Sequence, residues 1–321
     1  MLNPKCLICD GPVKPIDELY DDRYGYQKKF SLLECLQCKH KFLENRFDGD
    51  DIGDLYTNFY PRSSYNENDI VTPKIGKNLI LDWWGGLNSS AYRWVPASVR
   101  VLDIGCGFGR SLRYHKARGC EAYGVEADKN VAAVAKQLDL DITIGVFDPG
   151  AFPPESFEFI TLDQVLEHVI DPKITLEGVS RILLPTGRVI ITVPNSNGLG
   201  SRLFGKKWIH WHAPYHLQHY SVSSMAALAA QAGFQIEKVQ TITNSRWLDY
   251  QWRHLLQFPA QGEKSAFWSN HALNDSSLSM RAMIFIARVA RFSGLNSLLT
   301  RIVDLVGKGD NHLFILSKSL K

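Results

Sequence analysis

Four cysteines have the types and the spacing of a metal site. Cys6 and Cys9 form one Cys-x-x-Cys pair, and Cys35 and Cys38 form a second. Each pair is short enough for both sulfurs to reach one ion, and four thiolates complete the tetrahedral shell of zinc. A catalytic zinc usually keeps an open position, so this set predicts a structural zinc ribbon over residues 1–45. Buried cysteines without metal are the alternative.

A glycine-rich turn follows the apolar run 99–104. Gly105, Gly107 and Gly109 have the spacing Gly-x-Gly-x-Gly. Glycine adopts positive φ and lets a ligand approach the backbone closely, so the turn is a candidate cofactor loop. Dinucleotide sites use a related but different spacing, Gly-x-Gly-x-x-Gly.

Two acidic residues flank this turn and indicate which ligand it holds. Asp103 precedes the first glycine, where its carboxylate can receive the ammonium of a methionine moiety but would repel a pyrophosphate. Glu126 ends the next predicted strand, where it can accept hydrogen bonds from both ribose hydroxyls. Glu126 indicates an adenosyl ligand but also occurs in dinucleotide folds, and it is Asp103 that disfavours a pyrophosphate.

A third group of reactive residues is the histidine-rich segment 195–220. It contains four histidines and two tryptophans, and the topology predicted below places it over the ligand. Histidine titrates near neutral pH and suits proton removal, so we take His216, His212 and His168 as candidate bases. The structural alternative is that His216 and His219 cap the following helix or pack under the loop. A zinc site made of these histidines is also open, although no carboxylate or cysteine accompanies them in the segment.

Alternating strands and helices must position these residues. Short β-rich runs separated by helical stretches predict a doubly wound parallel α/β sheet. The predicted strands are 99–104, 122–126, 142–146, 157–162 and 188–193. A helix at 221–232, a strand at 234–241 and a final strand at 312–317 follow, with a mostly helical insertion at about 245–306.

The same patterns divide the chain into three parts. Residues 1–45 form the ribbon, 46–96 form a linker with a helix around 74–87, and 97–321 form the main domain. The helical part of the linker is a candidate lid over the cofactor, with a purely structural linker as the alternative.

Composition and charge restrict the partners. The chain holds 36 Lys and Arg against 33 Asp and Glu, and the net charge of +3 is spread along it, which makes nucleic acid an unlikely partner. The first residues lack a signal-peptide stretch, and no window reaches the roughly 18 apolar residues of a membrane span. We therefore expect a cytoplasmic protein, whose cysteines serve as thiols or metal ligands.

The cofactor loop and its surroundings resemble those of the class I S-adenosylmethionine (SAM)-dependent methyltransferases. The resemblance covers about 97–241 and the final strand, and it implies a Rossmann-like sheet with SAM as cofactor. It further implies that Asp148 lies near the adenine and that Asp163 and Gln164 face the methionine end. The sequence Leu166-Glu167-His168 matches a signature of that family.

The segment 208–221 is similar to the Trp and Pro-x-His-Leu-x-His-aromatic-Ser segment of a methyltransferase subgroup associated with glycans and secondary metabolites. This similarity implies a small-molecule or glycan acceptor. The cysteine ribbon is also similar to that of sugar C-methyltransferases, which have a larger C-terminal domain, and of zinc-finger ribosomal RNA methyltransferases. The ribbon carries acidic residues, which disfavours RNA. A non-catalytic SAM-binding interaction module is the remaining alternative.

The insertion has a basic, amphipathic part at 277–306. Its arginines alternate with large apolar residues, a pattern that allows contact with a membrane surface. Packing on the core or at a homodimer interface is the alternative that we favour.

Overall fold

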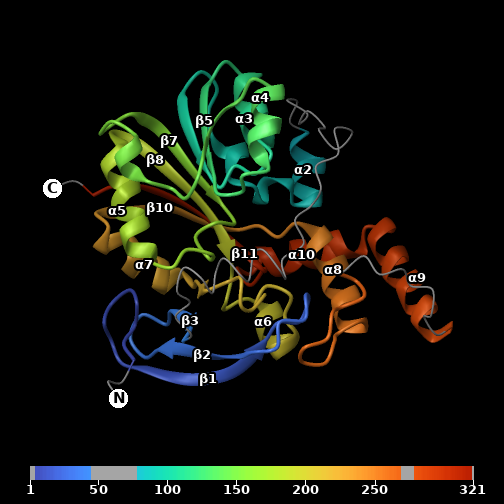
Figure 1. Ribbon diagram of the computed structural model, residues 1–321. Helices are drawn as coiled ribbons and strands as arrows, with labels where there is room; N and C mark the ends of the chain where they lie inside the picture. Colours follow the sequence, from blue (N-terminus) through green and yellow to red (C-terminus); the bar gives the residue numbers. More distant parts are fainter. Residues whose placement is uncertain (1–3, 45–77, 269–277, 320–321) are drawn as a thin grey trace.

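The computed structural model describes residues 4–44, 78–268 and 278–319 (Figure 1). A central sheet of seven strands has the order β10-β11-β8-β7-β4-β5-β6. Its strands are β4 (Arg100–Ile104), β5 (Glu121–Glu126), β6 (Asp141–Ile144), β7 (Phe157–Asp163), β8 (Leu183–Pro194), β10 (Phe234–Thr241) and β11 (Asn311–Lys318). The α/β doubly wound, Rossmann-like sheet predicted from the sequence is confirmed.

The strands β4 to β8 pair in parallel, and only β11 runs against its neighbours, β8 and β10, in this sheet. The carboxyl ends of the parallel strands therefore meet at one edge. In a doubly wound sheet that edge is where ligands bind.

Helices cover both faces of the central sheet (Figure 1). On one face lie α5 (Pro172–Ile182) and α7 (Val222–Gln231), and on the other lie α3 (Arg110–Lys116) and α4 (Val131–Gln137). Strand β8 shows why its sequence is continuously apolar. Its residue Val189 packs in the core on the side of α5 and α7, and the next residue, Ile190, packs in the core on the side of α3 and α4.

Local capping sets where α5 and α7 begin. Asp171 accepts hydrogen bonds from the backbone nitrogens of Lys173 (3.0 Å) and Ile174 (2.9 Å), and Pro172 occupies the first turn. Ser221 forms a reciprocal capping box with Ser224 at the start of α7. These caps fix the ends of the segments that precede each helix, including the histidine-rich one.

The predicted strands agree with the structure to within two residues at nearly every end. The exception is β8, which begins at Leu183 rather than at 188. The predicted helix around 74–87 corresponds to α2 (Leu79–Gly85), and residues 74–77 lie outside the described residues. Short helical turns complete this part of the chain: η3 (Leu87–Ser89), η4 (Ala91–Trp94), η5 (Pro149–Ala151), α6 (Leu199–Leu203) and η6 (Gly205–Lys207).

A second, antiparallel sheet has the order β1-β2-β3-β9. The cysteine-bearing part of the chain supplies β1 (Val13–Tyr20), β2 (Lys29–Cys35) and β3 (Lys41–Leu43). The fourth strand, β9 (Gln218–His219), comes from the histidine-rich segment. The sequence did not predict that strands from two distant parts of the chain pair in one sheet.

The insertion is mostly helical, as predicted. It contains α8 (Ser245–Leu256), α9 (Leu278–Phe292) and α10 (Leu295–Leu305). Within the described ranges, no single helix is long and apolar enough to cross a membrane. The pair Arg281–Phe292 and Leu295–Leu305 reaches that length and composition only when taken together, with a bend of 65° between its two parts.

Candidate functional site

The glycine turn after β4 has three left-handed residues, with φ of 72° at Gly105, 52° at Gly107 and 73° at Gly109. A Cβ on Gly105 would lie 2.4 Å from Val165, and one on Gly109 would lie 2.4 Å from Leu140, so both positions are closely packed. Gly107 differs, because no described atom lies within 4 Å of the place of its Cβ. The turn thus presents open backbone at its middle glycine.

Glu126 meets this turn at the carboxyl end of β5. One of its carboxylate oxygens accepts from Gly107 N (2.9 Å), and the other accepts from Asp128 N (2.9 Å). The glycine and the acid that the sequence predicted for one ligand are therefore in direct contact. A ligand hydroxyl placed here would find the carboxylate already oriented.

Asp103 lies beneath the turn rather than on its open side. Its side chain is buried, and it accepts hydrogen bonds from the hydroxyls of Ser111 and Thr161 (2.6 Å for Thr161). Burial raises the pKa of Asp103 to about 7. The carboxyl group thus links β4 to β7 and α3, and its contact with a cofactor stays a prediction.

Asp148 lies beyond β6, at the exposed end of the site. It is the N-cap of η5, and its Oδ1 accepts from Gly150 N (2.8 Å). No described contact joins it to the glycine turn, so its place beside an adenine also stays a prediction.

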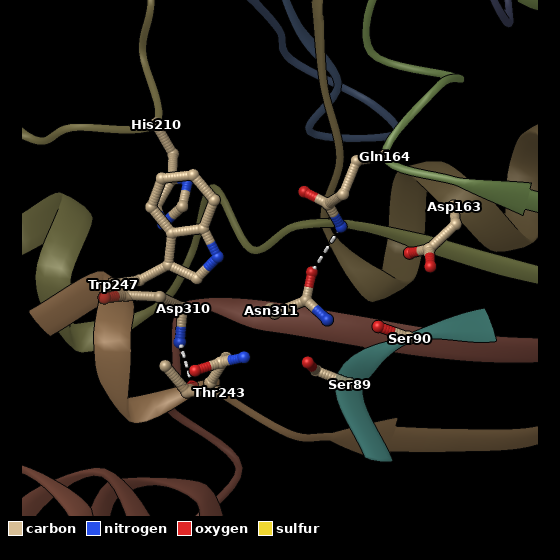
Figure 2. A pocket seen from close by; sticks show the side chains of 10 residues that line it. Ser89, Ser90, Asp163, Gln164, His210, Thr243, Trp247, Asp310 and Asn311 are labelled. Carbon is tan, nitrogen blue, oxygen red and sulfur yellow. Dashed lines mark hydrogen bonds between the residues drawn. The ribbon is translucent and has the colours of Figure 1, made fainter. Parts of the chain in front are cut away.

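A polar pocket of about 240 Å³ opens next to β7 (Figure 2). It is lined by hydroxyl, amide and carboxylate groups and by the rings of a histidine and a tryptophan. The lining residues are Ser89, Ser90, Asp163, Gln164, His210, Thr243, Asn244, Trp247, Asp310 and Asn311. Two of the predicted site residues, Asp163 and Gln164, therefore face a real cavity.

Hydrogen bonds fix the walls of the pocket. Gln164 Nε2 donates to Asn311 Oδ1 (2.8 Å), and Asp163 Oδ2 accepts from Ala91 N (3.2 Å). Gln164 has a φ of 57°, a strained backbone for a non-glycine residue, and such residues gather at functional sites. Burial raises the pKa of Asp163 and of Asp310 to about 6 each.

The three histidines proposed as bases lie close together, and their role as bases stays a prediction. The ring centroid of His216 lies 4.8 Å from that of His212 and 4.6 Å from that of His168. Burial lowers the pKa of His168 to about 4 and that of His212 and His216 well below the ordinary value. These imidazoles are therefore neutral at pH 7.

Among the four histidines of 208–220, it is His210 that lines the pocket, opposite Asp163 (Figure 2). Its Nε2 has no hydrogen-bond partner among the described residues, and burial lowers its pKa to about 3. Residue type and spacing do not rank His210 above its neighbours, because the orientation of a ring within a loop is set by packing.

Glu167 was named in the sequence only as part of a family signature, and no role in the site was predicted for it. Its carboxyl group is buried beside His168 and His216, and one ligand atom from each of the three lies within 4.8 Å of the others. Burial raises the pKa of Glu167 to about 8. The carboxylate that the histidine segment lacks in sequence is therefore supplied by the segment that follows β7.

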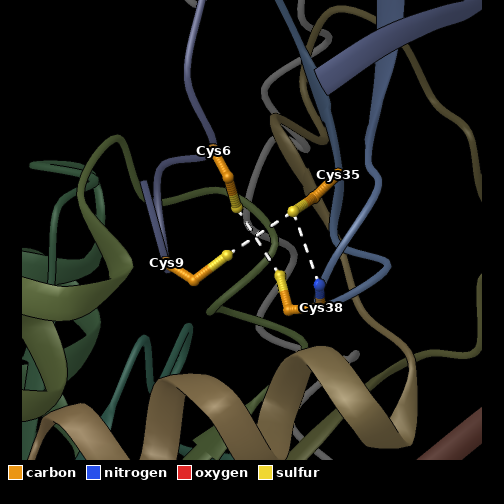
Figure 3. Close-up of side chains that lie close together, drawn as sticks. All are labelled: Cys6, Cys9, Cys35 and Cys38. Carbon is orange, nitrogen blue, oxygen red and sulfur yellow. Dashed lines mark hydrogen bonds between the residues drawn. The ribbon is translucent and has the colours of Figure 1, made fainter. Parts of the chain in front are cut away.

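The four predicted cysteine ligands converge at one point (Figure 3). The sulfurs of Cys6 and Cys38 are 3.6 Å apart, and those of Cys9 and Cys35 are 3.5 Å apart. Zn–S bonds of about 2.3 Å in a tetrahedron separate the sulfurs by about 3.8 Å, so the spacing fits one zinc ion. The contact between the two thiols lowers the pKa of Cys6 and raises that of Cys38, as expected for a pair of sulfurs that share one proton.

The cysteine cluster is attached to the histidine-rich segment. The backbone of β3 pairs with β9, and His40 Nε2 donates to Gln218 Oε1 (2.8 Å). Ser223 Oγ donates to the carbonyl of Cys38 (3.0 Å). The cysteines themselves pack in the same core cluster as α5 and α7. The cysteine-bearing end of the chain therefore supports the segment that borders the pocket.

Comparison with known proteins gives the family. A family model described as a methyltransferase domain matches residues 65–239. The chain is similar to the ubiquinone biosynthesis O-methyltransferases of Xanthomonas axonopodis pv. citri (27% identical over 168 residues, 48% of this chain and 70% of the relative) and Thiobacillus denitrificans (26% over 176 residues, 49% and 75%).

Solved structures with a similar arrangement have low sequence identity. Phosphoethanolamine N-methyltransferase 2 of Haemonchus contortus, in complex with SAM, is 20% identical, with a TM-score of 0.49 over 87% of this chain and 62% of that one. The complex of the Haloferax volcanii Trm112 methyltransferase activator with a methyltransferase gives 18% identity and a TM-score of 0.47, over 75% and 92%.

Proposed function

This chain belongs to the SAM-dependent methyltransferases, and we propose that it transfers the methyl group to an oxygen or carbon of a small hydroxylated acceptor or glycan. The observation that carries this proposal is the pocket. It shares Asp163 and Gln164 with the predicted methionine end of the cofactor site and continues away from it to Asn311 and Trp247. An acceptor there would lie next to the methyl group.

The groups around the pocket favour a polar ring as acceptor. Two carboxylates, three amides and several hydroxyls can hydrogen-bond to the hydroxyls of a sugar, and the indole of Trp247 offers a flat apolar face. A long apolar chain would leave these buried polar groups without partners, which is costly. The relatives named as O-methyltransferases are consistent with transfer to oxygen.

The residues proposed for SAM are Glu126 for the ribose, the turn at Gly105, Gly107 and Gly109, Asp103 beneath it, and Asp148 near the adenine. The open backbone at Gly107 and the oriented Glu126 carboxylate fit this ligand. When bound, SAM supplies a methyl group already activated on a sulfonium. The chain then has to align the acceptor with that methyl and remove its proton.

Histidine assistance is part of the proposal. His216, His212 and His168 remain the bases proposed from the sequence, and the pocket adds His210, whose neutral Nε2 can accept a proton from an acceptor hydroxyl. The four cysteines are proposed to hold a structural zinc ion. Unbridged cysteines fit a reducing compartment, so we propose the cytoplasm as the location.

Calorimetry with SAM followed by a labelled-methyl assay tests the function. The acceptor panel contains sugars, nucleotide-linked sugars, phenols and ribosomal RNA. We expect SAM binding and transfer to a hydroxylated ring compound. Transfer to RNA alone would support the zinc-finger RNA methyltransferase instead, and SAM binding without transfer to any cell-extract fraction would support a non-catalytic interaction module.

A second copy of the chain is the partner we propose for α9 and α10. Phe285 and Ile286 are each about two-thirds exposed, and Phe292 is 80% exposed, which is unusual for aromatic and aliphatic side chains gathered on one element. Mass photometry of the wild type and of Phe285→Ser tests this: we expect a dimer that the substitution weakens. A monomeric wild type that floats with anionic liposomes would point to peripheral membrane contact instead.

A further inference from the structure

The carboxyl group of Glu167 has an environment that the methyl-transfer proposal does not explain. The residue is fully buried, and neither of its carboxylate oxygens has a hydrogen-bond partner among the described residues. A buried carboxyl group without partners is costly, and native proteins usually satisfy it with a donor or a cation. Only the ionised form of this carboxyl group would need a positive partner, and no described residue forms an ion pair or hydrogen bond with its oxygens.

The two nearest candidate ligands are histidines already oriented by the backbone. His168 Nδ1 lies 2.9 Å from the carbonyl oxygen of Tyr215, and His216 Nδ1 lies 2.9 Å from that of His210. A carbonyl oxygen only accepts hydrogen bonds, so each Nδ1 carries the proton and each Nε2 keeps its lone pair. Metal-ligating histidines are commonly oriented by this kind of outer hydrogen bond.

The backbone also holds the two halves of the cluster together. The carbonyl of Glu167 accepts from both Leu217 N (2.8 Å) and Gln218 N (3.0 Å), which ties the residue after His216 to the segment that follows β7. One ligand atom from each of Glu167, His168 and His216 falls within 4.8 Å of the other two. This spacing suits three ligands around one ion.

We propose that Glu167, His168 and His216 bind a divalent transition-metal ion, at a second site separate from the four cysteines. Two imidazoles and one carboxylate suit Zn²⁺, and they also suit Mn²⁺, Fe²⁺ and Co²⁺. Three protein ligands leave a position open, and the half-buried His168 provides the accessible side of the site. This differs from the cysteine cluster, whose four thiolates complete the shell of their ion.

The proposed site borders the acceptor pocket through a single residue. His210 holds His216 by its carbonyl group and lines the pocket with its ring. If His168 and His216 bind metal through Nε2, they cannot serve as proton acceptors, and the role of base passes to His210 or His212. The inference goes beyond the proposed function, because metal binding is measured without any acceptor.

Cobalt titration of the full chain, stripped of metal under reducing conditions, tests the proposal. Co²⁺ in the cysteine cluster gives intense sulfur-to-metal charge-transfer bands, whereas Co²⁺ held by nitrogen and oxygen gives only weak visible bands. We expect two equivalents to bind, one with each signature. Glu167→Gln and His216→Asn should abolish the second signature and keep the first, which also reports that the variant is folded.

His115→Asn is the matched control, since His115 is equally buried, has no ring-nitrogen partner among the described residues, and lies in α3 away from the cluster. It should bind both equivalents. The proposal is overturned if the wild type saturates at one equivalent with thiolate bands, or if Glu167→Gln and His216→Asn both keep the second signature. A failure of methyl transfer in the separate assay would leave this result unchanged.

Discussion

Lys41 and His219 are partners in an antiparallel backbone pair, although one lies beside the cysteine cluster and the other ends the histidine-rich segment. The Lys41 ammonium also donates to the carbonyl of Ser196 (2.9 Å), at the exit of β8. The small sheet therefore extends directly into the segment that borders the pocket. We therefore expect that loss of order at the cysteines also increases the mobility of the histidine-rich segment.

The first prediction concerns zinc. Cys35→Ser should leave SAM affinity nearly unchanged and lower kcat/KM for the acceptor by about 10²-fold, since small displacements of positioning groups have effects of that size. Hydrogen exchange should rise in residues 208–220. Cys120→Ser is the control, because the Cys120 thiol only donates to Pro96 O (3.4 Å). Equal exchange in the wild type and Cys35→Ser would show that the two regions are independent.

The second prediction concerns the ribose acid. Glu126→Gln should weaken SAM binding by about tenfold to a hundredfold, because hydrogen bonds to a charged group contribute roughly 1.5–3 kcal/mol. Calorimetry with S-adenosylhomocysteine measures this without an acceptor. Glu121→Gln, at the other end of β5, removes the same charge from an exposed position and should bind normally. If both variants bind alike, Glu126 does not contact the cofactor.

The third prediction concerns the acceptor. Asn311→Ala removes the hydrogen bond to Gln164 and should raise KM for the acceptor by roughly tenfold, the effect of one lost neutral hydrogen bond. SAM affinity should stay the same. Asn130→Ala provides a control at an exposed helix start, where the side chain makes no capping bond. An unchanged acceptor KM in Asn311→Ala would place the acceptor elsewhere.

The fourth prediction concerns stability against pH. Burial lowers the pKa of His115 to about 4, below the value of about 6.5 in the unfolded chain, so the unfolded state binds the proton first. Its contribution is fully present above pH 6.5 and is lost as the pH falls toward 4. His115→Phe should therefore reduce the loss of unfolding free energy between pH 7.5 and pH 5 by about 2 kcal/mol. Urea unfolding of both proteins at both pH values measures this difference. An equal loss of unfolding free energy in the wild type and in His115→Phe would contradict the prediction.

Most of the fold could be predicted because its signals are local. The run Val101 to Ile104 and the three glycines after it are adjacent in sequence, and Glu126 ends the next strand, so the alternation of strands and helices places them at one sheet edge. The cysteine cluster was equally accessible, since its ligand spacing is short. Each of these features depends on periodicity or on pairs of close neighbours.

The features that were missed depend on contacts between distant segments. Strand β9 is only two residues long, and it forms because β3 offers it a partner. Glu167 reaches His216 across two segments, and Asp310 and Asn311 reach the pocket from the far end of the insertion. One signal for Glu167 was present in the sequence: a carboxylate directly after the apolar pair Val165 and Leu166 needs a reason to be there.

The pocket is completed late during synthesis, because one of its walls comes from the antiparallel strand β11. Gln164 and its partner Asn311 are separated by 147 positions, so at about 5–20 residues per second the ribosome makes them roughly 7–30 seconds apart. The glycine turn can close on its own neighbours in that interval, whereas the acceptor wall waits for β11 to enter between β8 and β10. The ribosome thus completes the proposed cofactor turn well before the wall that would face the acceptor.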